Sequence, residues 1–336
     1  MKNIQKRILV TGGCGFIGSC FITKQIKKQH FIVNLDKMTY ASNNNNLNEV
    51  VNSDNYVFFK GGIENTELTS YILEKYQIDW VVNFAAESHV DNSINNAEIF
   101  IKTNIEGTFN LLQSSLQYYR SLSDSKKENF RFLHVSTDEV FGSLLESEPA
   151  FTENNRYKPN SPYSASKASS DHLANAWFHT FNLPVIITNC SNNFGANQHS
   201  EKLIPTIIRS CLAQKDIPIY GNGKNIRDWI FVGDHCDGIE LALIKGKVGE
   251  SYCFGGENEI RNIDIANLIC EILDEVKPRA DGISYQTQIR FVQDRMGHDY
   301  RYAINNHKSC TELNFSVSKN FSERLRDVLE EVIAKI

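Results

Sequence analysis

The sequence predicts an α/β fold in which a doubly wound parallel sheet, covered by helices on both faces, is followed by a smaller α/β domain. Short apolar runs alternate with amphipathic stretches throughout the first half of the chain. The runs are continuously apolar, which is typical of parallel strands buried on both faces. After about residue 193 the pattern loosens into short segments rich in Asn, Gly and Asp. These three observations together favour a Rossmann-type sheet with a second, smaller unit.

The predicted strands are rich in Val, Ile and Phe and cover residues 7–11, 31–36, 56–60, 80–84, 131–136 and 184–189. The predicted helices between them cover residues 16–29, 65–76, 97–119 and 163–181. Later helical patterns occupy residues 263–276 and 321–336. We therefore expect a dinucleotide-binding domain over residues 1–192, to which residues 228–248 return. Residues 193–336 are expected to form mainly a substrate-binding domain over the carboxyl ends of the strands.

Length and composition narrow the functional class. The 336 residues suit one large domain plus a smaller one, and 41% hydrophobic with 22% charged residues is ordinary globular usage. The net charge of −5 comes without any basic block, so nucleic-acid binding is not expected. No apolar run reaches the roughly 18 residues of a membrane span, and the start fits no signal peptide. The eight scattered cysteines form no CxxC pair, which predicts a cytoplasmic protein without disulfides or a metal site.

A glycine motif, Gly13-x-Gly15-x-x-Gly18, follows the first predicted strand and opens the first predicted helix. Its glycines permit a tight turn, a close approach of pyrophosphate to the backbone, and packing of helix on strand. The helix N-terminus then offers free N–H groups to phosphates. Asp36 ends the second strand about 20 residues later, where a carboxylate accepts hydrogen bonds from ribose hydroxyls and repels a 2′-phosphate. The motif therefore favours NAD over NADP; the alternative is a glycine turn without a ligand.

Two further groups predict acid–base chemistry. Tyr163 and Lys167 are four residues apart and share one face of a predicted helix. A phenol ionises near pH ~10, and a neighbouring ammonium is expected to lower that pKa so that Tyr163 can act as a base. Thr137, Asp138 and Glu139 follow the fifth strand, where they offer a hydrogen-bonding hydroxyl, a proton donor and a proton acceptor. The alternatives are an ordinary surface helix and a solvated acidic turn.

With these motifs the chain resembles the extended short-chain dehydrogenase/reductases of the NAD-dependent epimerase/dehydratase family, and within them the dTDP-glucose 4,6-dehydratases. The matching segments are residues 11–18, 36–40, 85–91, 136–142, 163–167, 192–195, 201–205, 227–229 and 297–299. The resemblance runs from residue 8 to about residue 304, and the Thr137-Asp138-Glu139 run is its most specific part. Related 4-epimerases usually carry a pair of small residues in place of Asp138 and Glu139.

The resemblance implies dehydration of dTDP-glucose to dTDP-4-keto-6-deoxyglucose. Tyr163, assisted by Lys167, takes the proton of the C4 hydroxyl while NAD accepts the C4 hydride. Glu139 removes the C5 proton, Asp138 protonates the departing C6 hydroxyl, and the hydride returns to C6. The alternatives are a 4,6-dehydratase for a UDP- or CDP-hexose, a nucleotide-sugar 4-epimerase, and an inactive NAD-binding sensor.

The resemblance also implies two sets of binding residues. The cofactor set is Gly12, Gly15, Phe16, Ile17, Asp36, Lys37, Thr39, Gly62, Ile63, Phe84, Ala85, Ala86, Ser88, Thr103, Tyr163, Lys167 and Asn193. The substrate set is Ser88, Thr137, Asn192, Lys202, Leu203, Pro218, Ile219, Tyr220, Arg227, Asn262, Arg295 and His298. The guanidinium of Arg227 suits a diphosphate, with a surface salt bridge as the alternative. His298 and Tyr220 could equally be structural residues.

Several positions depart from the family pattern. Gly62 precedes Ile63 where the family usually has an Asp that contacts adenine, which removes that hydrogen-bond acceptor. Phe141 stands in place of Tyr, and Asn92 in place of Arg. No catalytic position is lost, so the departures leave open the nucleobase and the hexose. The helices over residues 97–119 and 163–181 are longer and more apolar than one buried face requires, and related enzymes pair through them, so we expect a homodimer.

Overall fold

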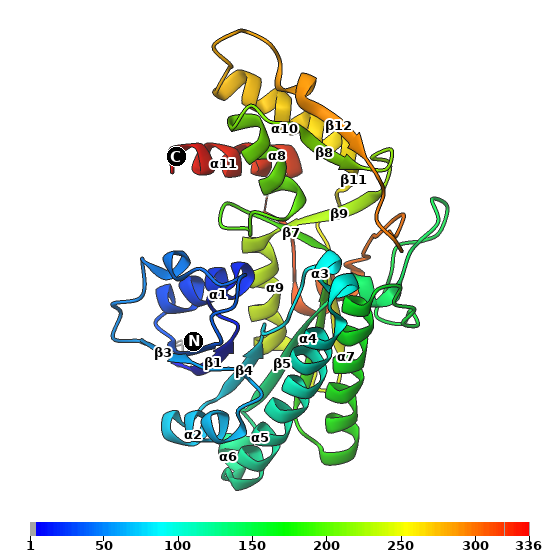
Figure 1. Ribbon diagram of the computed structural model, residues 1–336. Coiled ribbons are helices and arrows are strands. Elements are labelled where there is room, and N and C mark those ends of the chain that lie inside the picture. Colours follow the sequence, from blue (N-terminus) through cyan, green and yellow to red (C-terminus); the bar gives the residue numbers. More distant parts are fainter. Residues whose placement is uncertain (1–4, 319, 336) are drawn as a thin grey trace.

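The computed structural model describes residues 5–318 and 320–335 and shows two parts built on separate sheets (Figure 1). The larger part is a seven-stranded sheet of order β10-β6-β5-β4-β1-β2-β3, in which every neighbouring pair is parallel. Its strands are β1 (Arg7–Thr11), β2 (Phe31–Asp36), β3 (Tyr56–Lys60), β4 (Trp80–Asn83), β5 (Arg131–Thr137), β6 (Val185–Cys190) and β10 (Ser251–Phe254). This arrangement confirms the predicted Rossmann-type α/β fold.

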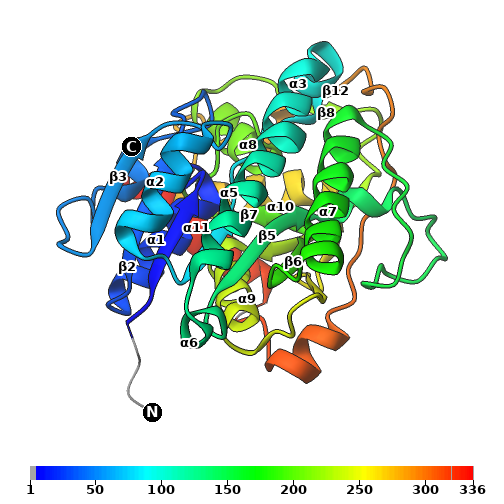
Figure 2. The same cartoon turned by 90° about the horizontal axis from the view of Figure 1, so that it is seen from below.

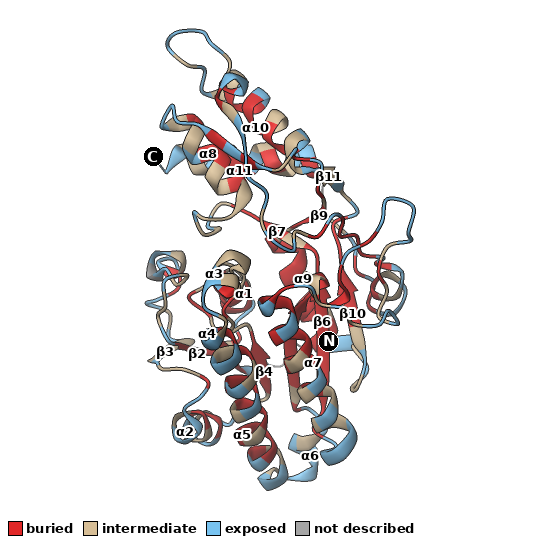
Figure 3. Ribbon diagram, turned by 45° about the vertical axis from the view of Figure 1, so that its right-hand side comes forward, coloured by how far each residue is buried: buried red, intermediate tan, exposed pale blue. Residues whose placement is uncertain are grey.

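The strands at the centre of the sheet are buried on both faces. In β1, Ile8 and Val10 pack with α1 (Phe16–Lys27) and α9 (Val232–Lys245) on one face of the sheet. Leu9 points to the other face, where its core contains residues of α2 (Thr66–Tyr76), α5 (Thr108–Ser121) and α7 (Pro162–Phe181). Figures 2 and 3 show these helices around the sheet and the buried strands between them. This two-sided burial explains why the strands read as continuous apolar runs.

β10 is a strand that the sequence analysis does not predict. It has only four residues, three of them fully buried, and it extends the sheet by pairing in parallel with β6. So short an apolar segment gives no periodicity to detect, and its place at the edge of the sheet depends on tertiary contacts. The helix α9 just before it packs against the large sheet.

The helix predicted over residues 97–119 is interrupted, which corrects that expectation. It consists of α4 (Ala97–Phe100), a π-helical segment (Ile101–Gly107) and then α5. Within the π-helical segment the buried Asn104 accepts a hydrogen bond from the backbone N–H of Glu87 at 2.8 Å. Its amide donates to the Glu87 carbonyl at 3.0 Å and to Ser166 Oγ at 2.8 Å. The wider turn thus lets one side chain join the loop after β4 to α7, at the side of the cavity described below.

The smaller part has its own hydrophobic core, formed by residues such as Phe194, Ile207, Ile269 and Leu325. Its sheets contain β7 (Asn192–Phe194), β9 (Ile226–Phe231) and β11 (Glu259–Arg261), and β8 (Ile217–Tyr220) with β12 (Ile289–Val292). Its helices are α8 (Leu203–Leu212), α10 (Asn262–Val276) and α11 (Phe321–Ala334). Short helices α3 (Val90–Asn95) and α6 (Asp124–Lys127) complete the larger part. Across the described residues, none of the helices has the length and apolar character needed to cross a membrane.

Candidate active site

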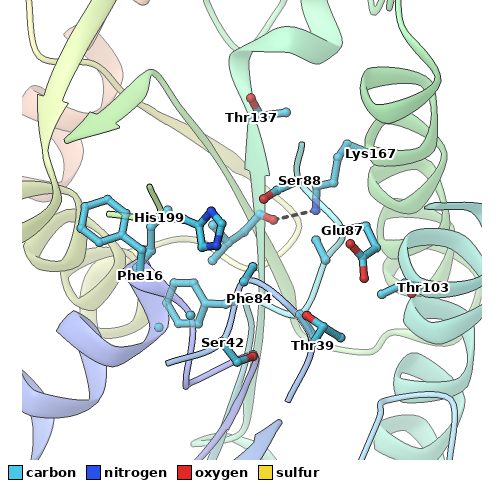
Figure 4. A pocket seen from close by; sticks show the side chains of 18 of the residues that line it. Phe16, Thr39, Ser42, Phe84, Glu87, Ser88, Thr103, Thr137, Lys167 and His199 are labelled. Carbon is cyan, nitrogen blue, oxygen red and sulfur yellow. Dashed lines mark hydrogen bonds between the residues drawn. The ribbon is translucent and has the colours of Figure 1, made fainter. Parts of the chain in front are cut away.

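A cavity of about 290 Å³ lies at the carboxyl edge of the large sheet, where the strand order reverses between β1 and β4. Every residue predicted to bind the cofactor lines this cavity, and so do Thr137, Asp138 and Glu139. Figure 4 shows Phe16 and His199 on one side of it and Thr103 and Lys167 on the other. Ligands bind in this crevice of doubly wound sheets because the loops after several strands converge there. The structure therefore brings the predicted cofactor and catalytic residues together.

The glycine loop after β1 is shaped for an anion. Gly12 has φ +69°, and a Cβ there would lie 2.7 Å from the backbone nitrogen of Ala85, so a side chain is excluded. A Cβ at Gly18 would lie 2.5 Å from the Gly12 carbonyl oxygen, which keeps α1 close to the loop. Gly15 forms the N-cap of α1 without a side-chain hydrogen bond, and little crowds its Cα. The first N–H groups of α1 are thus open to a phosphate in the cavity.

Asp36 stands at the end of β2, next to the glycine loop. Its carboxylate is buried and accepts hydrogen bonds from the backbone N–H of Cys14 and of Met38, and from Ser42 Oγ. These bonds fix its orientation and leave lone-pair capacity on a carboxylate that has about four acceptor sites. A ribose hydroxyl fits beside it, whereas a 2′-phosphate would meet its negative charge.

Thr137 ends β5, and Asp138 and Glu139 begin the short 3₁₀ turn that follows (Asp138–Phe141). Thr137 Oγ1 accepts from the backbone N–H of Glu139 at 3.3 Å and lies 3.2 Å from Asp138 Oδ1. Asp138 is buried, and its Oδ2 atom has no hydrogen-bond partner within the described residues. The burial of Asp138 excludes the solvated acidic turn, and an unpaired buried carboxyl oxygen that lines a cavity is typical of a catalytic group.

The two carboxyl groups differ in their surroundings. Burial, and then the charge of Glu139, raises the pKa of Asp138 well above its ordinary value, which favours its protonated form. Burial also raises the pKa of Glu139, but the positive charges of Lys202, Arg227 and Arg295 oppose that rise. The stronger rise at Asp138 makes it the better candidate for the acid of the pair and leaves Glu139 as the candidate base.

Tyr163 and Lys167 lie on one face of α7, as predicted, but the expected effect on the phenol pKa is wrong for the chain's own residues. Lys167 Nζ donates to the Val135 carbonyl at 2.8 Å, a bond drawn dashed in Figure 4, and lies 3.4 Å from His134 Nε2. The ammonium is therefore directed toward β5. Burial and the charge of Glu139 raise the pKa of Tyr163 well above its ordinary value.

A buried polar network that was not predicted from the sequence contacts Lys167 through His134. His134 Nε2 lies 3.3 Å from Asp171 Oδ1, and Asp171 Oδ2 accepts from Ser136 and Tyr157 at 2.7 and 3.0 Å. Burial and the charge of Lys167 lower the pKa of His134, so the imidazole is neutral. Asp171 provides a buried negative charge for Lys167. Its spacing of four residues from Lys167 on the same helix was a usable signal.

The predicted substrate residues divide into two groups. Ser88, Thr137, Asn192 and Lys202 line the cavity, and Lys202 Nζ donates to the Ser88 carbonyl at 3.0 Å. The others are not among its lining residues and lie mainly in the smaller part: Leu203, Pro218, Ile219, Tyr220, Arg227, Asn262, Arg295 and His298. Ile219 packs its side chain in the core of that part.

Arg227 is buried and so is not the surface salt bridge considered from the sequence, whereas its contact with a diphosphate stays a prediction. Its guanidinium is buried, donates to the carbonyls of Ile226, Asp299 and Tyr300, and lies 4.3 Å from the ring centroid of Tyr302. It therefore holds the loop around Asp299 in place and adds positive charge near Glu139. No surface salt bridge is needed to account for it.

Three other predicted residues meet at the outer edge of the site. The rings of Tyr220 and His298 make an edge contact at 6.3 Å, and the Arg295 guanidinium lies 5.5 Å from the Tyr220 centroid. His298 Nδ1 lies 2.6 Å from an oxygen of Asp294. Arg295 also reaches Asp91 of the larger part, at 3.5 Å. An exposed aromatic ring beside an arginine suits a base and a phosphate.

The cavity also contains residues that the sequence analysis did not select: Ser42, Glu64, Glu87, Cys190, Gln198 and His199. Glu87 belongs to a motif recognised in the sequence, but its neighbours in space come from the π-helical segment. His199 makes an edge contact with Tyr40 at 5.6 Å. These residues come from loops whose positions no local pattern specifies.

Comparison with known proteins places this geometry in a family. Residues 9–328 match the family model described as GDP-mannose 4,6 dehydratase. The dTDP-glucose 4,6-dehydratase of Haemophilus influenzae is 50% identical over 96% of both chains. A dTDP-glucose 4,6-dehydratase of Bacillus anthracis, solved in complex with NAD, is 40% identical with a TM-score of 0.85 over 97% of this chain and 96% of that one. That of Streptomyces venezuelae, solved with NAD and TYD bound, is 38% identical with a TM-score of 0.88 over 96% of both chains. The chain therefore belongs to the family of nucleotide-sugar 4,6-dehydratases that the family model and these relatives describe.

Proposed function

We propose that the chain is an NAD-dependent dTDP-glucose 4,6-dehydratase, a hydro-lyase that forms dTDP-4-keto-6-deoxyglucose and water. The observation that carries this proposal is the adjacent pair of the buried Asp138 and the half-buried Glu139, which lines the same cavity as Tyr163 and the glycine loop. A 4-epimerase needs no second acid–base pair beside its phenol, and an inactive sensor needs neither. The high identity to dTDP-glucose 4,6-dehydratases supports the thymidine nucleotide.

The residues of the cavity fit NAD. The glycine loop offers backbone N–H groups to the pyrophosphate, and Asp36 offers a carboxylate to the ribose without room for a 2′-phosphate charge. Tyr163 lies beside Thr137 and Glu139 in the same cavity, where the nicotinamide would lie, and Thr103 and Lys167 also line the cavity. When bound, the nicotinamide supplies a reversible hydride acceptor. Side chains of the protein carry out all the other steps.

Tyr163, as a phenolate that the positive charge of a bound nicotinamide would favour, would take the proton of the sugar C4 hydroxyl. Thr137 would be hydrogen-bonded to the same hydroxyl, so that C4 can be oxidised to a ketone. The ketone acidifies the C5 proton, which Glu139 removes. Asp138 gives its proton to the C6 hydroxyl, and the C6–O bond breaks with loss of water. Glu139 returns a proton to C5 when hydride returns to C6. The sugar loses and regains one hydride. Tyr163 then releases the proton that it has gained and Asp138 takes up a proton, both by exchange with solvent, so the net reaction is loss of water alone.

We propose that the larger part, residues 1–192 with the returning segment 228–248, holds the cofactor. Residues 193–336 would mainly bind the nucleotide. Ser88, Asn192 and Lys202 would contact the sugar and diphosphate from within the cavity. Tyr220, Arg295 and His298 would contact the base and diphosphate from the outer edge, with Leu203, Pro218, Ile219, Arg227 and Asn262 shaping that region.

The proposed function is tested by incubating the purified protein and catalytic NAD with dTDP-glucose, UDP-glucose, CDP-glucose and GDP-mannose in parallel. We expect dTDP-glucose to give 4-keto sugar absorbance in alkali, and NMR of the product to show a C6 methyl signal. An inverted C4 without that signal would make the chain an epimerase. Preferred turnover of another nucleotide would keep the chemistry and change the substrate.

The raised pKa of Asp138 predicts an alkaline limit to the reaction. The proton-donating form of Asp138 exists below its pKa, so we expect kcat to fall as the pH rises through that value. An Asp138→Asn variant cannot lose this proton, and its lower kcat should not show this alkaline decline. The measurement is kcat at saturating substrate between about pH 6 and pH 10 for both proteins. Parallel declines in the two proteins would assign the limit to another group.

We also propose a homodimer formed through α4, α5 and α7 and the π-helical segment. Large apolar side chains lie exposed along them: Ile99, Ile101, Phe109 and Phe181 are 42%, 48%, 42% and 37% exposed. The rings of Phe109 and Trp177 contact across α5 and α7 with centroids 5.6 Å apart, and Trp177 also contacts Phe181, so the aromatic side chains of the two helices are adjacent. An apolar face of this kind on a water-soluble surface is typical of an interface.

Light scattering on a sizing column should give a dimer for the wild type and a monomer for Phe109→Glu, because an unpaired buried charge cannot be accommodated at the interface. Phe58→Glu is the matched control: Phe58 is 38% exposed on β3, away from this face. A monomeric wild type at micromolar concentration would contradict the proposal.

We also propose that the protein functions in the cytoplasm. The buried thiols of Cys190, Cys211, Cys253 and Cys270 form no disulfide, which suits a reducing compartment.

A further inference from the structure

In the loop after β3, the side chain of Glu64 fills the space that a side chain at Gly62 would occupy. A Cβ built on Gly62 would lie 2.0 Å from Glu64 Oε2 and 2.4 Å from Glu64 Cδ. The carboxylate of Glu64 therefore occupies the space into which a side chain at position 62 would project. Gly62 is not among the positive-φ glycines of the described chain, so its backbone would accept an L side chain if Glu64 moved away.

This carboxylate lies at the end of the cavity where the adenine of a dinucleotide would be bound. Asp36, the ribose-binding candidate, ends β2 and pairs in register with Lys60 at the end of β3. The base attached to that ribose must therefore lie over the loops that follow β2 and β3. Lys37, Gly62, Ile63 and Glu64 of these two loops all line the cavity.

Glu64 is held in place from the other loop. Lys37 Nζ donates to Glu64 Oε1 at 2.5 Å, which leaves Oε2 directed at Gly62. Partial burial acts to raise the pKa of Glu64, but the hydrogen bond and charge of Lys37 outweigh it and lower that pKa, so the side chain is ionised. An ionised carboxylate accepts hydrogen bonds and donates none, which suits the exocyclic amino group of adenine.

We propose that Glu64, oriented by Lys37, is the residue that recognises the 6-amino group of the cofactor's adenine, in place of a side chain at position 62. The inference rests on the proposed use of NAD. The alternative is an ordinary surface ion pair, since the side chains of Lys37 and Glu64 are 55% and 43% exposed, and such a pair would contribute little to any property of the protein. Glu64, two residues after Gly62 in the same loop, thus supplies the hydrogen-bond acceptor that position 62 lacks.

The test compares NAD with nicotinamide hypoxanthine dinucleotide, in which a carbonyl oxygen replaces the amino group. The purified holoprotein is equilibrated with an excess of both dinucleotides in equal amounts, desalted rapidly, and the ratio bound is measured by chromatography. We expect the wild type to prefer NAD by about two- to tenfold, the worth of one hydrogen bond. In Glu64→Ala the preference should fall to near one, and in the double variant Gly62→Asp/Glu64→Ala it should return.

Glu67→Ala is the matched control, because Glu67 is an exposed acid in the first turn of α2, outside the residues that line the cavity. It should keep the wild-type preference. A Glu64→Ala protein that still prefers NAD as strongly as the wild type would overturn the inference and leave the proposed function intact. A wild type that binds neither dinucleotide would overturn both. Because the readout is the composition of the bound cofactor, a change in turnover cannot imitate either result.

Discussion

Replacing Tyr163 by Phe should lower kcat by about 10²- to 10⁴-fold, the usual contribution of a positioned general base. The variant removes one hydroxyl from a side chain that lies in the cavity beside Thr137 and Glu139. Its ring, which makes an edge contact with Phe100 at 6.3 Å, can remain where it is, so folding should be preserved. The proton of the substrate C4 hydroxyl would then have no acceptor.

The measurement is the initial rate of 4-keto sugar formation at saturating dTDP-glucose, with the melting temperature measured in parallel. Tyr71→Phe serves as a matched control, since Tyr71 is 48% exposed on α2. A Tyr163→Phe protein within a few-fold of wild-type kcat would mean that another group takes this proton.

Replacing Glu139 by Gln should lower kcat by a similar factor of about 10²–10⁴ through a different step. Gln has the same shape and can keep the contact with Ser164 Oγ, which lies 3.3 Å from Glu139 Oε2. It cannot accept the C5 proton, so elimination of water should stop after oxidation at C4. The loss of one negative charge beside Asp138 should not disturb the fold.

Deuterium separates this step from the others. In D₂O the wild type should form a product labelled at C5, because the proton removed there is replaced from solvent. Glu139→Gln should show almost no label at C5 in recovered substrate or product. Glu146→Gln, an exposed acid in the loop after the same turn, is the control. Rapid C5 labelling by Glu139→Gln would transfer the role of base to a different residue.

The sequence was sufficient for those features that local chemistry specifies. The strands of the large sheet were predictable because burial on both faces demands continuous apolar runs, and β10 was missed because four residues carry no such pattern. The glycine loop, Asp36, and the Thr137–Glu139 run were predictable because each follows a strand directly, and all such ends meet at one edge of a parallel sheet. That is why every predicted cofactor and catalytic residue lines one cavity.

Only the tertiary structure decided which partners each side chain has. The sequence spacing places Lys167 on the same helix face as Tyr163. In the folded protein, however, its ammonium group donates to the carbonyl of Val135 and contacts the ring of His134, both on β5. Arg227 could have formed a surface salt bridge, but folding buries it beside Tyr302, and its guanidinium donates to the carbonyls of Asp299 and Tyr300. Glu64 fills the space above Gly62 because two loops converge there. The residue type fixes which bonds a side chain can make, whereas the packing of distant segments determines which of them it makes.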